Sequence, residues 1–596
     1  MNRISVFMSG MLLLLRYAAM AQPISGVVNN YAAVTNISGT GITVASTAMA
    51  APFLPGDRAL LIQMKGASVN QTNQAGFGDI VSMGGAGTYE FLNVSSASGS
   101  VVTVSSALTR TYNVSSGWVQ LVRVPRFCSP VVSNTLSCAS WTSTTKTGGV
   151  LAFEAGTLTL NADIDVSEKG FKGGSFTAGT FSCTVGTFGG ASGVYGGQKG
   201  ESISEYVPGL NGFKGHQANG GGASNAGNSG GGGGGNAGEG GFGGNQYSGC
   251  DTIYDERGIG GASLTPVLSS MWLGGGGGGG FRDNGLTASS GGNGGGIIYI
   301  RANAIIANGH MISSNGGNVT IMADGEGSGG GGAGGTVFLE CNNISGNLSV
   351  NTKGGFGGSN NNSMFVSFCH GPGGGGGGGL FAFSGASLPG NVTYNTQGGL
   401  PGVINNTSSA CYNTSFGATA GASGTLIAGL PASAQILNAA PALVITPSTT
   451  ICRGEAVTLF ANNGQAYYWS NGSNDSTIVV TPSVSTSYTV VSTHGNVNSC
   501  QASASTNIIV SLCTGIASLH IQGAQFSMYP NPAGNQLFVE TPAAMRLIIY
   551  DGLGKTVMDR PLSEGVNTLD LSDLKPGVYL VTDAAHTQVM KLIRAD

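Results

Sequence analysis

Three uninterrupted runs of glycine, at residues 230–235, 274–280 and 373–379, constrain the fold of this chain more than any other feature. Glycine loses more backbone freedom on folding than any other residue, so runs of this kind are typical of flexible linkers. They could also form loops that hold phosphate, or belong to a folded architecture that needs glycine. The choice between these interpretations decides most of what the sequence says about function.

A phosphate-binding loop is disfavoured by the residues around the runs. Such a loop needs a strand, a glycine-rich turn and a helix whose first amides face the anion. None of the runs is followed by Lys-Ser or Lys-Thr, and no helical pattern of apolar residues follows any of them. We therefore expect no nucleotide site in the chain.

A repeat of short apolar strands accompanies the glycine runs. Four segments, beginning at Gly148, Gly295, Gly334 and Gly378, share a Gly-Gly pair, an alternating strand, a weak turn, a second strand and further glycine. In the last three, 20 to 21 residues separate the first glycine from the closing Gly-Gly. Because one side of each strand is apolar, each unit must stack on another to bury it. The predicted inward positions are Leu151, Phe153, Ile298, Ile300, Val337, Leu339, Phe381 and Phe383.

The run at residues 373–379 continues without a break into the strand at Leu380, which indicates a packed segment and not a linker. Without side chains, extended threefold helices can approach closely and bond through their backbones, as glycine permits at the crowded axis of collagen. The strict Gly-X-Y period of collagen itself is absent. We therefore predict, over residues 128–440, a laterally bonded bundle of polyglycine-II-like strands capped by the apolar β units. In such a bundle, replacing Gly277 with valine destabilises the domain.

The composition favours an ordered chain with an unusual surface. Glycine contributes 106 of the 596 residues, and charged residues only 8%, against about a quarter in a typical soluble protein. A hydrophobic fraction of 40% and a formal charge of −4 disfavour disorder of the whole chain. Lysine and arginine are too sparse and too scattered to form a surface for nucleic acid.

Residues 1–21 have the pattern of a secretory signal peptide, with a basic Arg3, an apolar stretch and an Ala-Met-Ala cleavage site. The apolar stretch is shorter than the roughly 18 residues that a transmembrane helix needs. Ten cysteines without a Cys-x-x-Cys pair favour disulfides in an oxidising compartment over zinc or iron–sulfur sites. The sequence therefore predicts an exported protein.

Two further regions have the patterning of β modules. Alternating apolar and polar residues over 22–127 predict half-buried strands, arranged as a β-barrel or sandwich. Residues 441–513 place Trp469 among short strands between two cysteines, and resemble the bacterial immunoglobulin-like and PKD-type modules of secreted proteins. The resemblance implies a disulfide between Cys452 and Cys500 and a role as a spacer. Residues 514–525 are interpreted as a linker.

Residues 526–596 carry the most specific resemblance in the chain. The segments FSMYPNPAGNQLFVE, RLIIYDGLGKTVMD, LDLSDLKPGVYLV and VMKLIRAD indicate a compact β-sandwich with Pro-Asn-Pro and Asp-Gly turns. They resemble the C-terminal sorting domain of proteins exported by the type IX secretion system of certain Gram-negative bacteria. The matching positions are Tyr529, Pro530, Asn531, Pro532, Gly554, Lys555, Pro576, Gly577, Val578, Tyr579, Lys591, Leu592 and Ile593. The resemblance implies export by that machinery, removal of the domain and attachment to surface lipopolysaccharide.

The charged residues do not nominate an active site. Asp163 and Asp165 would share one face of a strand, where paired carboxylates could support hydrolysis or hold calcium. A solvated polar face explains the same pair, and we favour that interpretation. The densest polar cluster lies in residues 250–261 and is typical of an exposed loop, with a binding loop as the alternative. Its charged members are Asp251, Asp255, Glu256 and Arg257.

Cys369 and His370 are adjacent, and neighbours on a strand point to opposite faces, which disfavours a nucleophile and base pair. We expect instead a disulfide from Cys369 to Cys341 or Cys411. No catalytic residue, cofactor site or metal site is therefore predicted.

The sequence as a whole predicts an all-β multidomain protein: a barrel or sandwich, a glycine-rich β array, an immunoglobulin-like sandwich and a sorting domain. The glycine-rich part also resembles glycine-rich β domains of bacterial surface proteins. We expect a secreted, surface-attached, non-enzymatic adhesin or structural component, with an exported carbohydrate-active β-solenoid enzyme or polysaccharide-binding protein as the alternative. Aromatic residues between the glycines would contact a glycan or other surface ligand, or anchor the glycine strands. They are Tyr195, Tyr206, Phe213, Phe242 and Tyr247.

Overall fold

The computed structural model describes residues 22–45, 53–127, 129–225, 227–250, 255–431, 443–462, 466–493, 501–511 and 526–595. Within these residues the regular structure consists of strands without helices, which confirms the prediction of an all-β multidomain chain. In the same ranges, no helix is long and apolar enough to cross a membrane. The predicted signal peptide, residues 1–21, and the predicted linker, residues 514–525, lie outside the described residues.

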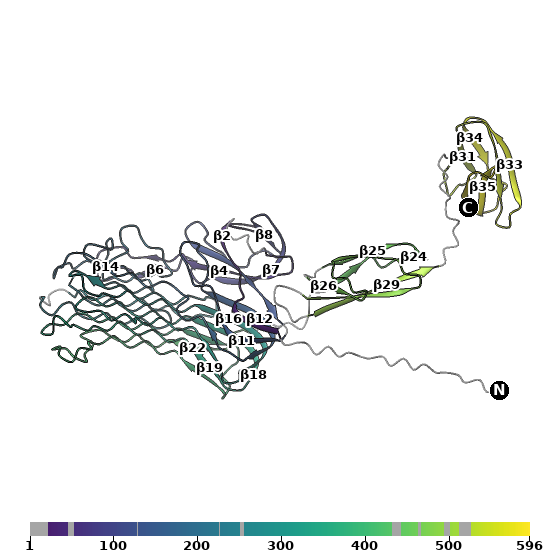
Figure 1. The fold of residues 1–596 in the computed structure, drawn as a ribbon. Coiled ribbons are helices and arrows are strands. Elements are labelled where there is room, and N and C mark those ends of the chain that lie inside the picture. Colours follow the sequence, from purple (N-terminus) through teal and green to yellow (C-terminus); the bar gives the residue numbers. More distant parts are fainter. Residues whose placement is uncertain are drawn as a thin grey trace, which may run out of the picture. The chain divides into compact units, whose positions relative to one another are not determined.

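Six strands between residues 31 and 124 close into a β-barrel, one of the two arrangements that the sequence left open. In barrel order they are β2 (Tyr31–Ser38), β3 (Gly41–Val44), β8 (Val101–Val104), β7 (Tyr89–Ser98), β4 (Arg58–Lys65) and β9 (Trp118–Val124). Strand β4 is apolar on both sides. Ala59 and Leu61 fill the barrel, whereas Leu60 and Ile62 belong to a second core outside it. The outer wall of the barrel therefore packs against the glycine-rich region (Figure 1).

Residues 443–511 form two sheets of short strands. The first contains β23 (Val444–Thr446), β25 (Val457–Asn462) and β27 (Thr477–Val480), and the second β24 (Thr450–Cys452), β29 (Gln501–Ser511), β28 (Thr486–Thr493) and β26 (Ala466–Trp469). Trp469 is buried, and its Nε1 donates to the carbonyl of Asp475 at 2.8 Å. Cys452 is disulfide-bonded, but Cys500 lies outside the described residues, so the pairing of these two cysteines stays a prediction.

Residues 526–595 form two sheets around one apolar core. One contains β30 (Ser527–Tyr529), β31 (Gln536–Thr541) and β34 (Gly565–Asp570), and the other β33 (Thr556–Leu562), β32 (Met545–Tyr550), β35 (Gly577–Asp583) and β36 (Val589–Arg594). Leu537, Val539, Ile549 and Val581 are fully buried in this core. The alternating burial of these strands is what a two-sheet sandwich requires, because each strand turns every second residue inward.

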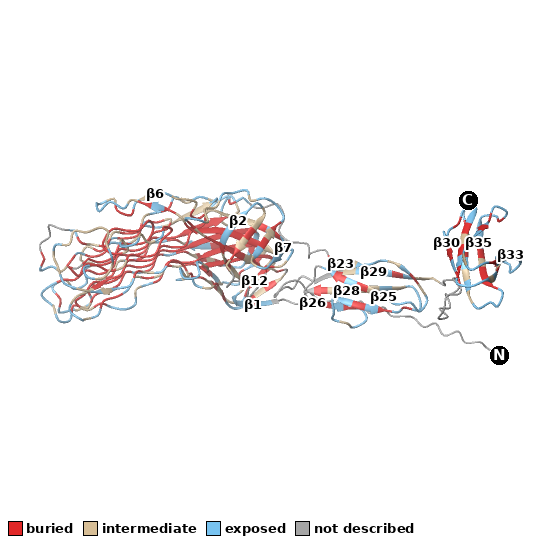
Figure 2. Cartoon of the chain, turned by 90° about the horizontal axis from the view of Figure 1, so that it is seen from above, coloured by how far each residue is buried: buried red, intermediate tan, exposed pale blue. Residues whose placement is uncertain are grey.

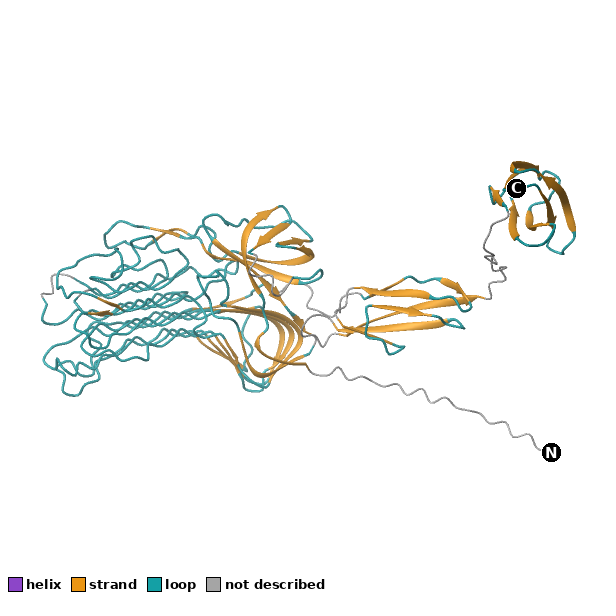
Figure 3. Cartoon of the chain, turned by 45° about the horizontal axis from the view of Figure 1, so that its top comes forward, coloured by secondary structure: helices purple, strands orange, loops and turns teal. Residues whose placement is uncertain are grey.

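The strands of the repeats form a parallel sheet at one end of the glycine-rich region. Its first series is β12 (Val150–Leu160), β16 (Ile297–Ile306), β18 (Thr336–Ser345), β20 (Leu380–Phe383) and β22 (Thr425–Ala428), and its second is β13 (Ile164–Asp165), β17 (Met311–Ser313), β19 (Leu348–Asn351) and β21 (Val392–Asn395). Strand β11 (Pro130–Ser137) joins the two series, and β1 (Gln22–Val27) and β10 (Arg126–Phe127) pair with β11 and β12. Figure 3 shows these strands at one end of the region, with the glycine segments leading away from them.

The register of the sheet places equivalent residues of the repeats directly beside one another. Phe153, Ile300, Leu339 and Phe383 are successive partners across four strands. They share one core with residues of the second series, which confirms the predicted inward positions. The opposite side of the first series is buried as well, because Tyr299 and its neighbours pack against the barrel. Burial on both sides is usual for parallel sheets, although the sequence predicted only one buried side.

The run at residues 274–280 lies at the centre of a bundle of extended segments. Its amides donate in rotation to three neighbours, and every third amide returns to the same neighbour. The bonds, of 2.8–3.0 Å, are Gly274 N to Gly295 O, Gly275 N to Gly235 O, Gly276 N to Glu201 O, Gly277 N to Gly292 O, Gly278 N to Gly232 O, Gly279 N to Gln198 O and Gly280 N to Ser289 O. A period of three residues per turn is that of the polyproline II helix. The run is therefore a threefold helix bonded to its surroundings.

The carbonyl groups of the same run accept hydrogen bonds from three further segments, at residues 171–177, 221–224 and 330–333. The run thus has six bonded neighbours, and its buried backbone groups are satisfied, as buried groups must be. The runs at 230–235 and 373–379 show the same threefold rotation of donors, and the first of them bonds to both of the others. The laterally bonded bundle that the sequence predicts is present, and the runs are not linkers.

Glycine is required in the bundle because the segments lie too close together for a side chain. A Cβ added at Gly277 would lie 2.0 Å from the carbonyl oxygen of Gly330, and one added at Gly376 would lie 2.0 Å from that of Gly332. Neither residue has a positive φ, so close approach and not backbone conformation demands glycine here. All three runs are buried, as the red segments of the bundle show in Figure 2.

A buried ion pair fixes the barrel to the bundle. Lys65 at the end of β4 lies 2.7 Å from Glu201, and both side chains are almost fully buried. The Lys65 ammonium also lies 4.5 Å from the ring centre of Trp118 and 5.2 Å from that of Phe171. Burial lowers the pKa of Lys65, and the Glu201 carboxylate opposes that shift. Loss of one partner would leave a buried unpaired charge, so removing either side chain would destabilise the contact between the two parts.

The close packing of the runs yields a direct test. Replacing Gly277 with alanine adds one methyl group against a backbone oxygen, so the neighbouring segments must separate and lose hydrogen bonds. We expect a loss of about 3 kcal/mol or more in unfolding free energy, measured by calorimetry or denaturant unfolding. Gly390→Ala is the matched control, because a Cβ there meets no atom within 4 Å. Equal stability of the two variants would show that residues 274–280 are not packed.

Candidate functional site

The outer surface of the bundle is where the glycine-rich region can present side chains. In a threefold helix, residues three apart point in the same direction. Three repeats close with such a pair: Asn315-Gly-Gly-Asn318, Lys353-Gly-Gly-Phe356 and Gln397-Gly-Gly-Leu400. The two glycines between each pair are packed against neighbours in the bundle, and the flanking residues are left for the surface.

Backbone hydrogen bonds align these three segments side by side. The amide of Gly316 donates to the carbonyl of Lys353, and that of Gly354 donates to the carbonyl of Gln397. The same pairing continues three residues later, from Val319 to Phe356 and from Gly357 to Leu400. Two rows result, which together we call the ladder face. Its members are Asn315, Lys353 and Gln397 in the first row and Asn318, Phe356 and Leu400 in the second.

A groove of about 530 Å³ runs along the ladder face. Besides all six residues of the two rows, it is lined by Asn395 at one side and by small residues. The small lining residues are Gly316, Gly354, Gly398, Gly421 and Ser423. Glycine at the floor lets a ligand approach the backbone closely. Phe356 and Leu400 are 51% and 61% exposed, so both apolar side chains are open to a ligand in the groove.

The asparagine side chains of the groove use their carbonyl oxygens internally. The Oδ1 atoms of Asn315 and Asn318 accept from the amides of Lys353 and Phe356 at 2.9 and 2.8 Å. Asn395 Oδ1 likewise accepts from the Gln397 amide at 3.0 Å. Because the oxygen of each side chain is held by the backbone, its NH2 group is the part left to contact a ligand.

The ladder face is not among the sites that the sequence predicts. A sequence pattern that could have revealed this face is the closing Gly-Gly of each repeat. The two glycines are the same in every repeat, whereas the residues that flank them differ. The predicted aromatic contacts lie elsewhere. Tyr206 and Phe213 pack within the structure, where the Tyr206 hydroxyl donates to the Lys199 carbonyl at 2.7 Å, whereas Tyr195 and Phe242 are partly exposed.

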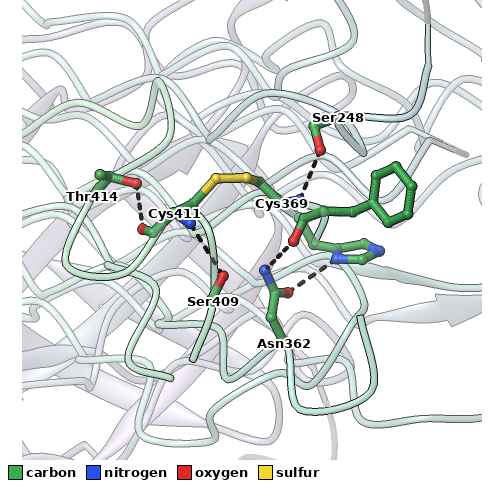
Figure 4. The surroundings of a disulfide bond; sticks show 8 residues. Ser248, Asn362, Cys369, Ser409, Cys411 and Thr414 are labelled. Atoms are coloured by element: carbon green, nitrogen blue, oxygen red, sulfur yellow. Dashed lines mark hydrogen bonds between the residues drawn. A yellow bond between two sulfur atoms is a disulfide. The ribbon is translucent and has the colours of Figure 1, made fainter. Parts of the chain in front are cut away.

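A second candidate surface lies at the end of the bundle away from the apolar sheet, where disulfides join the loops. Cys369 pairs with Cys411, and Cys183 pairs with Cys250. Figure 4 shows the first of these, with Ser248 Oγ accepting from the Cys369 amide at 2.8 Å. The predicted partner Cys411 is therefore confirmed. The alternative, Cys341, is wrong: this residue is a buried free thiol, and burial raises its pKa to about 11.

The predicted polar cluster of residues 250–261 borders a pocket of about 330 Å³ at this end. Arg257 donates to both carboxylate oxygens of Asp255, at 2.8 and 2.7 Å, and this contact lowers the pKa of Asp255. Glu256 is buried, and its carboxylate accepts from the Gly186 amide at 2.5 Å and from the side chain of Asn225. Tyr247 also lines the pocket, and Asp251 lies outside the described residues.

Two buried ionisable groups lie near Asp283 at the same end. His370 stacks at a ring distance of 5.0 Å from Tyr247, and burial lowers its pKa to about 4, against the attraction of Asp283 and Asp324. Glu326 is buried, and burial together with the side-chain contact to Asp283 raises its pKa to about 8. At neutral pH the folded protein therefore keeps both groups uncharged.

The paired aspartates of the sequence analysis do not form a joint site. Asp163 contacts His310, at 3.0 Å between Oδ1 and Nδ1, and accepts from the Met311 amide. Asp165 Oδ1 instead accepts from the amide of Ser167, two residues on, at 2.8 Å. Among the described residues, no group of three His, Cys, Asp or Glu side chains could hold a metal ion.

Several positions of the predicted sorting motif hold the last module together. The Asn531 side chain donates to the Lys591 carbonyl at 2.6 Å and accepts from the Ile593 amide at 2.8 Å. The Tyr579 hydroxyl donates to the Lys575 carbonyl at 2.7 Å. Gly554 adopts φ +84°, which favours glycine, in the turn before Lys555. The motif residues thus join the Pro-Asn-Pro turn to the edge strand β36.

A comparison with protein families identifies this module. The model of the secretion system C-terminal sorting domain matches residues 527–594. The resemblance to type IX sorting domains is therefore confirmed, and it indicates export and a cell-surface or extracellular location. No curated protein matches the chain.

Similarities to solved structures are low. A biofilm associated protein, BSP domain, aligns with 12% identity over 26% of this chain and 29% of that chain, at a TM-score of 0.10. A carbohydrate-binding module of the β-sandwich superfamily aligns with 14% identity over 27% of this chain and 94% of that chain, at a TM-score of 0.11. The Gp54 tailspike of Acinetobacter baumannii bacteriophage AP22 aligns with 12% identity over 64% of this chain and 58% of that chain, at a TM-score of 0.12. At these TM-scores the alignments carry no argument about this chain.

The pKa of His370 is lowered and that of Glu326 is raised, so substitutions at these two residues should change the pH dependence of stability in opposite directions. Between about pH 6.5 and 4 the unfolded chain binds a proton at residue 370 that the folded chain does not, so stability falls on acidification, by up to about 3 kcal/mol. Glu326 holds an extra proton in the folded state from about pH 4.5 to 8, so stability falls as the pH rises through that range.

Relative to the wild type, His370→Gln should therefore gain stability toward pH 4, whereas Glu326→Gln should gain toward pH 8. Calorimetry of the three proteins across this range measures both differences. Stability differences that do not vary with pH would contradict the assigned shifts.

The sorting domain predicts a defined fate for a truncated chain. Without residues 526–596, the protein should accumulate in the periplasm of its native host, as shown by cell fractionation and by protection from added protease. A chain that lacks residues 441–513 but keeps the sorting domain is the control, and it should reach the surface. Normal surface delivery of the first variant would rule out the sorting function.

Proposed function

We propose that the chain is a surface-displayed, non-enzymatic adhesin that binds its ligand through the ladder face. The observation that carries this proposal is the alignment of non-glycine residues from three repeats into two exposed rows along one groove. The glycines between them are fixed by packing, and Asn315 and Asn318 bond to backbone amides of the next segment. The remaining outward residues can vary without disturbing the bundle. Such a surface is suited to recognition, because its support is rigid and its contacts are set by side chains alone.

The charged residues of the first 431 residues support the same proposal. Lys199 is fully buried, and its Nζ donates to the carbonyls of Phe188, Phe213 and Gly215. Glu154 contacts three arginines, and Lys65 pairs with Glu201. These charges are used to join parts of the fold. Apart from Lys353, the ladder face therefore relies on amides and apolar groups, which are suited to a glycan.

The pocket at the end of the bundle favours a second candidate, a carbohydrate-active enzyme. It gathers Asp255, Glu256 and Arg257, and glycoside hydrolysis needs two carboxyl groups. Both carboxylates already have internal partners, however: Asp255 holds Arg257, and Glu256 holds the Gly186 amide. A catalytic acid or base must be within reach of the substrate, so these engagements favour display over catalysis.

Attachment after export completes the proposal. The sorting domain would be removed at the surface, and the remaining chain would be joined to lipopolysaccharide, as the family resemblance implies. The barrel and bundle would then face the surroundings of the cell, with residues 443–511 as the spacer.

Binding and turnover assays in parallel test the proposal. We expect the purified chain from residue 22 onward to bind glycans on an array, and to release no reducing ends from the polysaccharides that it binds. Phe356→Ala should reduce the bound signal about tenfold, because it removes the largest exposed apolar contact of the ladder face. Tyr412→Ala, at an aromatic residue that is 50% exposed and lies outside the groove, is the matched control. Turnover of a bound polysaccharide, or equal binding by both variants, would contradict the proposal.

A further inference from the structure

We propose that the groove on the ladder face selects an acidic polysaccharide, one whose sugar units carry carboxylates. This inference rests on the proposed binding function and adds the chemical class of the ligand. It is argued from the hydrogen-bonding groups, the charge and the spacing of the residues that line the groove.

The polar groups of the groove are mainly donors. The oxygens of Asn315, Asn318 and Asn395 are held by backbone amides, which leaves their NH2 groups for the ligand. Lys353 adds an ammonium group, which donates and cannot accept. No carboxylate is among the residues that line the groove. A surface of this kind matches a ligand rich in acceptors, and carboxylates are the strongest acceptors that a polysaccharide offers.

Lys353 occupies the middle position of the first row, between Asn315 and Gln397. It is exposed, and no carboxylate lies within salt-bridge distance of it among the residues that the structure describes. This distinguishes it from Lys65 and Lys214, which pair with buried glutamates. A cation at the centre of a donor-lined groove favours a negatively charged ligand over a neutral one.

The spacing of the rows favours a polymer over a single sugar. The bundle segments bond side by side through their backbones, as strands do at a spacing of about 4.8 Å, so a polymer that crosses them meets an equivalent position in each repeat. The first row offers polar donors, and the second offers the Phe356 ring and the Leu400 side chain. A sugar ring has polar edges and an apolar face, so both rows can contact the same polymer.

One acidic side chain lies beside this surface. Glu168 belongs to the first repeat, where its amide donates to the Asn315 carbonyl, and its side chain is exposed. It is about two segments from Lys353, which is close to the screening length at 0.1 M salt. Glu168 should therefore repel an acidic ligand weakly. Neutralising Glu168 should raise the affinity for such a ligand, whereas neutralising Lys353 should lower it.

The test compares polygalacturonate with its fully methyl-esterified form, in which each carboxylate is replaced by an uncharged methyl ester. Binding to the purified chain is measured by calorimetry at low salt. We expect polygalacturonate to bind about tenfold more tightly than the ester, and the difference to shrink as salt is added. Lys353→Gln should remove most of that preference, whereas Glu168→Gln should increase it. Lys172→Gln, at an exposed lysine outside the groove, should leave it unchanged.

Each other outcome contradicts the inference in a different way. Equal affinity for the two polymers, lost in both cases with Phe356→Ala, would overturn the acidic ligand class but leave the ladder face as a glycan-binding surface. Binding of neither polymer, with a dimer in sedimentation that Phe356→Ala dissociates, would assign the groove to a second copy of the chain. Tight polygalacturonate binding that neither Lys353→Gln nor Phe356→Ala weakens would place the site elsewhere, while the binding function would remain.

Discussion

Lateral hydrogen bonds between glycine backbones are the interaction on which the rest of this structure depends. Each amide of the run at 274–280 bonds to a neighbouring segment, and the absence of side chains permits that approach. Ordering a residue costs about 1–2 kcal/mol, and a hydrogen bond returns about 0.5–1.5 kcal/mol net. The bundle therefore needs support from elsewhere. At one end the apolar strands fix the register of the segments, and at the other the pairs Cys183–Cys250 and Cys369–Cys411 join the loops.

The buried glycines hold the bundle together, and the exposed residues between them are available to bind a ligand. Inside the bundle, positions such as Gly277 and Gly376 are constrained to glycine by a neighbouring carbonyl oxygen. On the outside, residues three apart project from a backbone that is already fixed. The ladder face thus combines a rigid support with side chains such as Lys353, Phe356 and Leu400, whose identity the fold does not dictate. Recognition surfaces with this property lose little conformational entropy on binding, because their backbone is ordered in advance.

The sequence predicted the parts of the fold that follow from local pattern. The inward positions Phe153, Ile300, Leu339 and Phe383 could be found because apolar residues recur at the same place in each repeat. The bundle followed from the steric freedom of glycine and the unbroken passage into Leu380. The sorting domain followed from a motif with fixed residues, which the family comparison confirmed.

The candidate site could not be predicted in the same way. Asn318, Phe356 and Leu400 lie 38 and 44 residues apart in the sequence, and only the register of the bundle brings them together. Whether Cys369 pairs with Cys341 or Cys411 depended likewise on how the loops at the end of the bundle meet. The second buried side of the sheet required knowledge of the barrel, because alternation within a strand does not reveal what covers its other face.

Amide hydrogen exchange of the glycine runs tests the central claim most directly. If residues 274–280 are a buried, laterally bonded helix, their amides should exchange as slowly as those of β16 and β18, which lie in the core of the sheet. Protection should be continuous along the run, since all seven amides have partners. Exchange of these amides at the rate of an unstructured chain, with β16 and β18 still protected, would contradict the bundle.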